Sequence, residues 1–157
     1  MKRRQFAQLV GLACLGMTSS KAQAVEKIDP DPAAVELCSK LLEALCTENY
    51  DARIKAVLPL VHSSLRNRQG TDLDRTVKDF SFKKASGAAK LYGPPAVVTE
   101  VHKGRESTIG FRETAERGRT DKYFVAKLDP ANGRPAPLHV FWPSNGGKPS
   151  IVNMGSL

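Results

Sequence analysis

The spacing of apolar residues changes once along this chain, near Pro94, and this change constrains the fold more than any other feature. Before it, apolar residues recur every three to four positions, as on one face of a helix. After it, they alternate with polar residues, as in strands that bury one face. The pattern predicts an α+β fold, with two to three N-terminal helices packed on a curved antiparallel sheet of about five strands.

The first half contains two longer predicted helices and one short one. The first begins at Asp31-Pro32, because an Asp side chain can cap a helix and proline suits its first position. Its apolar stripe is Val35, Cys38, Leu41, Leu42 and Leu45. We expect Asn49 to cap a second helix over residues 50–69, and Pro59 to kink or split it. A short third helix is predicted from residue 71 to about residue 80 or 82.

Five segments of the second half read as strands separated by short turns. They are residues 96–104, 107–115, 121–129, 137–143 and 149–155. Pairs that contain glycine, such as Lys103-Gly104 and Arg117-Gly118, mark the predicted turns. Consecutive strands with short connections predict an antiparallel meander.

The alternation within two strands predicts which side chains face the helices. Since the more apolar set should be buried, the residues expected in the core are Phe124, Ala126, Leu128, Val140 and Trp142. Tyr123 then falls on the other face of its strand. His139 is expected to point outward or toward the mouth of a pocket.

The order of these elements is similar to that of a known superfamily. The joint ENYDARIKAVLPL leads into the second predicted helix, and the chain closes with YFVAKLDPANGRPAPLHVFWPSNGGKPSIVNMGSL. Over about residues 31–157 this layout resembles the nuclear transport factor 2-like superfamily. In that superfamily a strand, a hairpin loop, an apolar-aromatic strand, a Gly-rich turn and a final strand follow in order. A cystatin-like sheet with one helix is the nearest alternative, and the second apolar helix counts against it.

The resemblance implies a cone in which the concave sheet and the helices enclose a pocket. Some members, similar to ketosteroid isomerase or scytalone dehydratase, use Asp, His and Tyr in that pocket. Others bind small molecules or serve in assembly, and members often dimerise through the open sheet. No catalytic motif of those enzymes carries over to a position in this chain, and the fold by itself implies no reaction.

Four residues are candidates for lining such a pocket: Asp51, His62, Tyr123 and His139. Capping the second helix is the simpler role for Asp51, and a hydrogen-bonded place at a helix interface is the simpler role for His62. The sequence has no paired histidines, no carboxylate cluster and no glycine-rich phosphate loop before a helix. We therefore expect neither a metal nor a cofactor.

Cys38 and Cys46 lie in the first helical segment. Eight residues at the helical rise separate their Cα atoms by roughly 12 Å. A disulfide needs Cα atoms within about 7 Å, so we expect two free thiols that pack as small apolar groups.

The first 24 residues have the layout of a bacterial secretory signal. Lys2, Arg3 and Arg4 precede an apolar run of about a dozen residues, and a small-x-small triplet ends at Ala24. A membrane-spanning helix needs about 20 residues, so we expect cleavage after Ala24 and no permanent anchor. The export route, general secretory or twin-arginine, stays open, and the destination is the periplasm or the exterior.

This prediction divides the chain into a signal over 1–24, a short leader over 25–30 and a single domain over 31–157. Removing the signal lowers the formal net charge from +8 to +4, because it deletes four bases and no acid. The remaining bases concentrate between Arg53 and Lys90.

A nucleic-acid partner is not expected for this basic segment, because a groove-reading motif is missing and only Phe80 and Phe82 are near it. The positive charge could instead belong to a solvated helix face, or it could face an acidic protein surface or anionic lipid. The surface candidates are Arg66, Arg68, Lys83 and Lys84.

These observations favour an exported binding or interaction domain. Its expected ligand is a small apolar molecule or a partner protein, and a homodimer through the sheet is possible on the resemblance. The alternative is a cofactor-free isomerase, dehydratase or hydrolase with a pocket Asp or His as general base.

Overall fold

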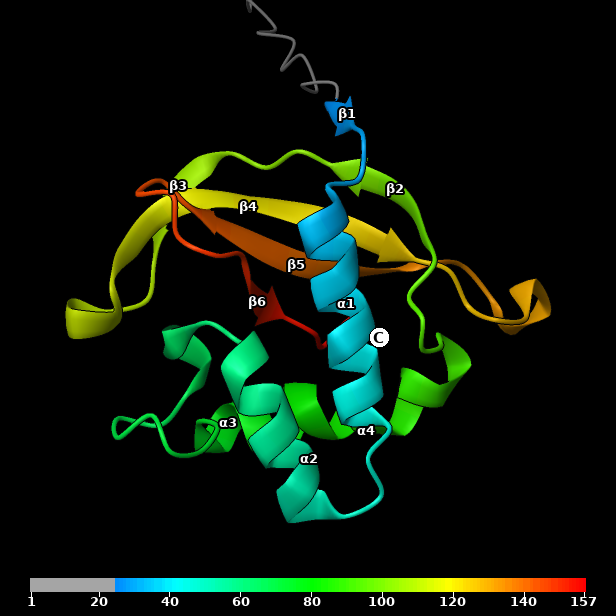
Figure 1. The fold of residues 1–157 in the computed structure, drawn as a ribbon, viewed down its shortest axis with the longest axis horizontal. Helices are drawn as coiled ribbons and strands as arrows, with labels where there is room; N and C mark the ends of the chain where they lie inside the picture. The colour runs from blue at the N-terminus through cyan, green and yellow to red at the C-terminus, as the bar shows by residue number, and fades with distance from the viewer. Residues whose placement is uncertain (1–24) are drawn as a thin grey trace, which may run out of the picture.

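Helices of the first half lie against the sheet that the second half forms (Figure 1). The computed structural model describes residues 25–157, and the predicted export signal lies outside the described residues. The chain has the predicted α+β fold, with helices packed on an open antiparallel sheet of six strands. In Figure 1, α1 crosses β4 and β5, while α2, α3 and α4 gather at one end of α1. None of the helices between residues 25 and 157 is long and apolar enough to cross a membrane.

Side-chain caps begin the first two helices where the sequence predicts them. α1 spans Pro32–Leu45, and Asp31 Oδ1 accepts a hydrogen bond from the Ala33 N–H at 2.8 Å. α2 spans Tyr50–Val57, and Asn49 Oδ1 accepts from the Ala52 N–H at 2.9 Å. The helix breaks next to Pro59, where a kink or split is predicted, but the prediction that the helix resumes and runs to residue 69 is wrong. Only short 3₁₀ turns over 58–60 and 63–65 follow it, because Pro59 cannot donate the hydrogen bond that would continue the helix.

The third helical segment is longer than predicted, and we call it helix 75–91. It consists of α3 (Arg75–Val77), a π-helical turn (Lys78–Phe82), α4 (Lys83–Ala88) and a 3₁₀ turn (Ala89–Leu91). Its cap is Asp74, whose Oδ1 accepts from the Thr76 N–H at 2.9 Å. The segment runs through Ser86 and Gly87 because Phe82, Ala85 and Ala89 are fully buried against the core, so packing overrides local propensity.

The sheet contains one strand more than predicted. The strands are β1 Lys27–Ile28, β2 Val98–His102, β3 Glu106–Ile109, β4 Glu116–Val125, β5 Ala136–Pro143 and β6 Ser150–Asn153. Their order is β1-β2-β4-β5-β6, with β3 paired to the other end of β4, and every pair is antiparallel. The additional strand, β1, lies in the segment predicted to be a loose leader.

Two of the predicted turns lie inside the sheet. His102 pairs with Lys122 and Glu106 with Arg119, so β2 and β3 are two parts of one strand that runs along β4, with a bulge at Lys103–Arg105. Gly104 and Gly118 are required there by close backbone contacts. A Cβ on Gly104 would lie 1.7 Å from the carbonyl oxygen of Thr120. A Cβ on Gly118 would lie 2.2 Å from the carbonyl oxygen of Trp142. The sequence pattern does not separate these glycines from turn glycines.

The predicted faces of β4 are reversed. Tyr123 and Val125 are fully buried and belong to the core. Phe124 is only half-buried, and Leu128 is 64% exposed. β4 ends at Val125, so Leu128 lies in the following loop and its apolar character does not report on the sheet. In β5, Val140 is buried as predicted.

Within residues 25–157, Cys38 and Cys46 form no disulfide; Cys38 is buried in α1 and Cys46 is half-buried at its end. Burial raises the pKa of the Cys38 thiol to about 12. Because the thiolate is the reactive form, we expect iodoacetamide at mildly alkaline pH to leave Cys38 unmodified in the native protein. Mass spectrometry of alkylated peptides should show Cys38 modified only after denaturation. Equal labelling before and after denaturation would contradict its place in the core.

Candidate functional site

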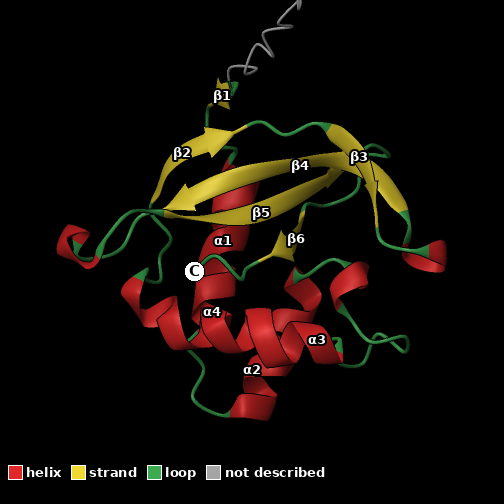
Figure 2. Ribbon diagram, turned by 180° about the vertical axis from the view of Figure 1, so that it is seen from behind, coloured by secondary structure: helices red, strands yellow, loops and turns green. Residues whose placement is uncertain are grey.

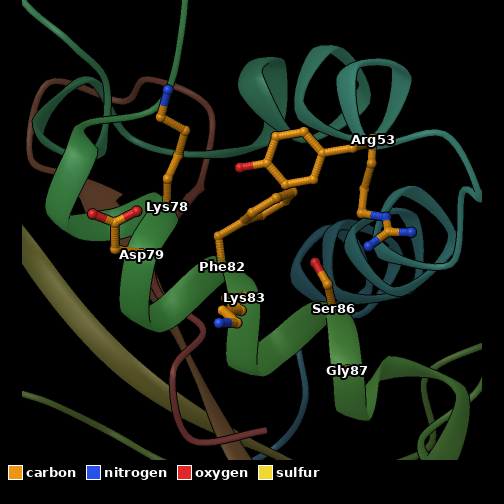
Figure 3. A pocket seen from close by; sticks show the side chains of 8 residues that line it. Arg53, Lys78, Asp79, Phe82, Lys83, Ser86 and Gly87 are labelled. Atoms are coloured by element: carbon orange, nitrogen blue, oxygen red, sulfur yellow. The ribbon is translucent and has the colours of Figure 1, made fainter.

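A cleft of about 610 Å³ opens between α2 and helix 75–91. Figure 3 shows Phe82 and Ser86 pointing from helix 75–91 toward α2, with Arg53 of α2 facing them. The residues that line the cleft are Tyr50, Arg53, Lys78, Asp79, Phe82, Lys83, Ser86 and Gly87. Most of these side chains are either aromatic or basic, which defines the chemistry of the site.

Two aromatic rings form the apolar part of the cleft. Phe82 is fully buried, and the ring of Tyr50 meets it edge to face, with centroids 5.8 Å apart and planes at 75°. Tyr50 leaves 53% of its surface exposed. It stands in the first turn of α2, directly after the Asn49 cap, and Phe82 closes the π-helical turn. A flat apolar group can therefore stack on the exposed ring of Tyr50, which the buried ring of Phe82 supports from below.

Arg53 is held in place at one side of the cleft by backbone oxygens. Its Nε donates to the Thr47 carbonyl at 2.6 Å and its Nη2 donates to the Glu48 carbonyl at 3.1 Å. These carbonyls follow the C-terminal end of α1, where a cation is favoured by the helix dipole. The guanidinium is thus fixed by the fold and keeps a positive charge at the cleft.

The other charged groups of the cleft differ in whether they already have an ion-pair partner. Lys78 Nζ lies 2.6 Å from Asp72 Oδ2, and this hydrogen bond raises the pKa of Lys78 and lowers that of Asp72. Asp79 lies 3.7 Å from Arg75. Lys83 is exposed, and within residues 25–157 its ammonium has no hydrogen bond or ion pair. The cleft therefore combines three cations with one carboxylate, and one cation is free for a ligand.

The four predicted pocket residues are not brought together. Asp51 is exposed in the first turn of α2 and lines a separate shallow groove with Asn67 and Thr71, while Asn49 holds the cap. Tyr123 is buried in the core, which raises its pKa to about 12. His139 pairs with the exposed Lys122, and so lies on the sheet face opposite the core.

His62 is buried, with 5% of its surface exposed, and connects three parts of the chain. Its Nε2 lies 3.1 Å from Glu116 Oε2, and its Nδ1 accepts from the Ser64 N–H at 3.1 Å with Ser64 Oγ at 2.9 Å. Its ring meets Phe141 edge to face, with centroids 5.2 Å apart. A Ser–His–Glu chain of this kind resembles a hydrolase relay, but here Nδ1 caps the 63–65 turn, so the arrangement is structural.

The four basic surface candidates do not form one patch. Arg66 Nη2 donates to the Val61 carbonyl at 2.7 Å and is half-buried, and Arg68 is exposed in the loop that follows. Lys84 Nζ donates to the Gly155 carbonyl at 2.8 Å. Of the four, only Lys83 lines the cleft.

Tyr50 and Phe82 line the cleft but are not among the four pocket residues predicted from the sequence. The sequence does contain a signal for Tyr50, because an aromatic residue directly after the helix cap Asn49 stands at an exposed helix end. Phe82 carried no such signal, because its direction depends on the π-helical turn.

Comparisons with known proteins found no match to this chain among protein-family models, curated proteins or solved structures.

Replacing His62 tests its structural role. We expect His62→Ala to lower the free energy of unfolding by about 2–4 kcal/mol, because it leaves a cavity and removes hydrogen bonds to two elements. Urea denaturation measures the loss. The matched control is His102→Ala, a half-exposed histidine on the sheet, which should cost less than about 1 kcal/mol. Equal losses in the two variants would contradict the role of His62.

His139 should titrate at a lower pH than a free histidine. Burial, and then the charge of Lys122, lower its pKa. A lowered folded pKa means that the unfolded chain binds the proton more readily. Stability should therefore fall as the pH drops through the ordinary value of about 6.5 toward the lowered folded one. NMR titration gives the pKa, and urea denaturation of the parent and of His139→Gln against pH gives the linkage. A pKa at or above the ordinary value would contradict this assignment.

Proposed function

We propose that this chain is an exported binding domain, and that its ligand is a small organic anion with a flat apolar body. The ligand stacks on Tyr50 in the cleft between α2 and helix 75–91, with its acidic group near Lys83. The observation that carries the proposal is the pairing of an exposed aromatic ring with a free ammonium across one cleft. Export is supported by the secretory layout of residues 1–24.

The ligand class follows from the charges and the rings. Stacking on an aromatic ring with an exposed face favours a planar apolar group. Two further cations, Arg53 and Lys78, keep the potential of the cleft positive even though both are already hydrogen-bonded. A carboxylate or sulfonate gains charge-assisted hydrogen bonds there, which a neutral ligand does not.

The enzyme alternative has weaker support in this cleft. Its base would be a pocket Asp or His, and the titratable acid among the lining residues is Asp79, which lies beside Arg75. The interior of the fold, where the superfamily resemblance implies a pocket, holds the packed side chains of Tyr123, Leu138 and Val140. A binding function needs no further group and is the proposal we make.

A pair of fluorescent probes tests the cleft. The sulfonate 1-anilinonaphthalene-8-sulfonate and the neutral N-phenyl-1-naphthylamine share one ring system and differ by the acidic group. We expect the sulfonate to bind more tightly, because the cleft offers a free ammonium. Tyr50→Ala should weaken both probes by about tenfold, whereas Lys83→Gln should weaken only the sulfonate. Fluorescence titration measures each affinity.

The matched control is Phe111→Ala, because Phe111 is an exposed aromatic residue that does not line the cleft. This variant should bind both probes as the parent does. An affinity for the sulfonate that is the same in Tyr50→Ala as in the parent would contradict the proposal.

A further inference from the structure

Helix 75–91 has a second exposed face, directed away from the core. Phe80, Lys84, Gly87 and Leu91 follow at spacings of four, three and four residues, and all four are exposed. Phe80 leaves 71% of its surface in solvent and Leu91 leaves 43%. We define the Phe80 face as Phe80, Lys83, Lys84, Lys90 and Leu91.

The cations of this face lack acidic partners. No hydrogen bond or ion pair joins the side chains of Lys83 or Lys90 to another residue of 25–157, and Lys84 bonds only to the Gly155 carbonyl. The nearest acid on the helix is Asp79, beside Arg75 at 3.7 Å. Within residues 25–157, none of these three ammonium groups beside the exposed ring of Phe80 is paired with an acidic side chain.

A shallow groove of about 550 Å³ runs along this face. It is lined by Asp79, Phe80, Ser81, Lys83, Lys84, Gly87 and Gly155. Asp79, Lys83 and Gly87 also line the cleft, so these three residues form the ridge between the two hollows. Phe80 and Lys84 line the groove but do not line the cleft.

We infer that the Phe80 face docks on an anionic phospholipid surface. Phe80 enters the boundary between headgroups and acyl chains, and the lysines lie along the phosphates with their apolar stems against the membrane. Each lysine near an anionic bilayer contributes about 1 kcal/mol, which makes three of them significant together.

The chemistry of the face favours lipid over another macromolecule. A nucleic-acid site stacks successive bases on several aromatic rings, whereas Phe80 is the one aromatic side chain among the residues that line this groove. An acidic protein would pair with the lysines but would need a pocket to bury Phe80. A bilayer surface accommodates a protruding ring and flexible ammonium groups without shape complementarity.

Vesicle sedimentation tests the inference with the full chain. We expect binding to vesicles of phosphatidylcholine mixed with phosphatidylglycerol, little binding to phosphatidylcholine alone, and loss of binding in high salt. Lys84→Gln/Lys90→Gln should weaken binding by about tenfold to thirtyfold, and Phe80→Ser by about tenfold. All variants carry the same N-terminus, so any contribution of residues 1–24 cancels in the comparison.

Two matched controls separate the face from general charge and apolarity. Lys55→Gln/Lys148→Gln removes the same charge from exposed lysines outside helix 75–91, and Phe111→Ser removes an exposed aromatic ring from a hairpin tip. Both should bind vesicles nearly as the parent does. Equal weakening in test and control variants would overturn the inference.

A tryptophan variant reports insertion directly. Phe80→Trp should retain vesicle binding, and brominated lipids should quench its fluorescence beyond the level seen for the half-buried Trp142 of the parent. Binding without added quenching would overturn insertion, and binding to soluble polyglutamate but not to vesicles would assign the face to an acidic protein. Phe80→Ser should bind the cleft probe unchanged, so the two proposals can fail separately.

Discussion

Both walls of the cleft are tied to a single short strand, β6. At one end of it, the His62 N–H donates to the Ile151 carbonyl at 2.9 Å, and this bond fixes the segment that follows α2. Just beyond its other end, Lys84 of helix 75–91 donates to the Gly155 carbonyl at 2.8 Å. β6 is therefore a common attachment for the segment that follows α2 and for helix 75–91, and it is itself held in the sheet by β5 (Figure 2).

The His62 junction extends this restraint to β4. Glu116, at the start of β4, bonds to His62 and lies 3.4 Å from Asn145 in the β5–β6 turn. His62 thus joins the segment that follows α2 to two strands. Its side chain bonds to Glu116 of β4, and its backbone N–H bonds to Ile151 of β6. A site built on two walls needs such a common anchor, because a shift of about 1 Å between the walls would change every contact across the cleft.

The fold class could be predicted from the sequence because it depends on periodicity, and a change of period survives local errors. Capping was also predictable, since Asp31 and Asn49 act on backbone groups two and three residues away. The sequence did not predict which face of β4 is buried, because the burial of its side chains depends on where the strand ends. The sequence also did not predict that Gly104 and Gly118 lie inside the sheet, since glycine is favoured both in turns and where two backbones approach closely. The site was missed because its walls come from segments that only tertiary contacts bring together.

The concentration of bases between Arg53 and Lys90 has a largely structural origin. Arg53, Arg66 and Lys84 each donate to backbone carbonyls, where loops and chain ends leave acceptors unsatisfied. Lys78 and Arg75 have acidic partners. The bases of helix 75–91 that have no partner within residues 25–157 are Lys83 and Lys90, and Lys83 belongs to both the cleft and the Phe80 face.

The π-helical turn explains how one helix can serve both surfaces. The segment over Lys78–Phe82 carries Phe80 outward, while Phe82 turns into the core beneath Tyr50. A π turn inserts an extra residue into the helical repeat and is less stable than a continued α-helix, so it persists only where tertiary contacts hold it. Here the buried ring of Phe82 on one side and the Lys78–Asp72 ion pair on the other supply those contacts. The irregularity that periodicity could not reveal is therefore the element on which the chemistry of both surfaces depends.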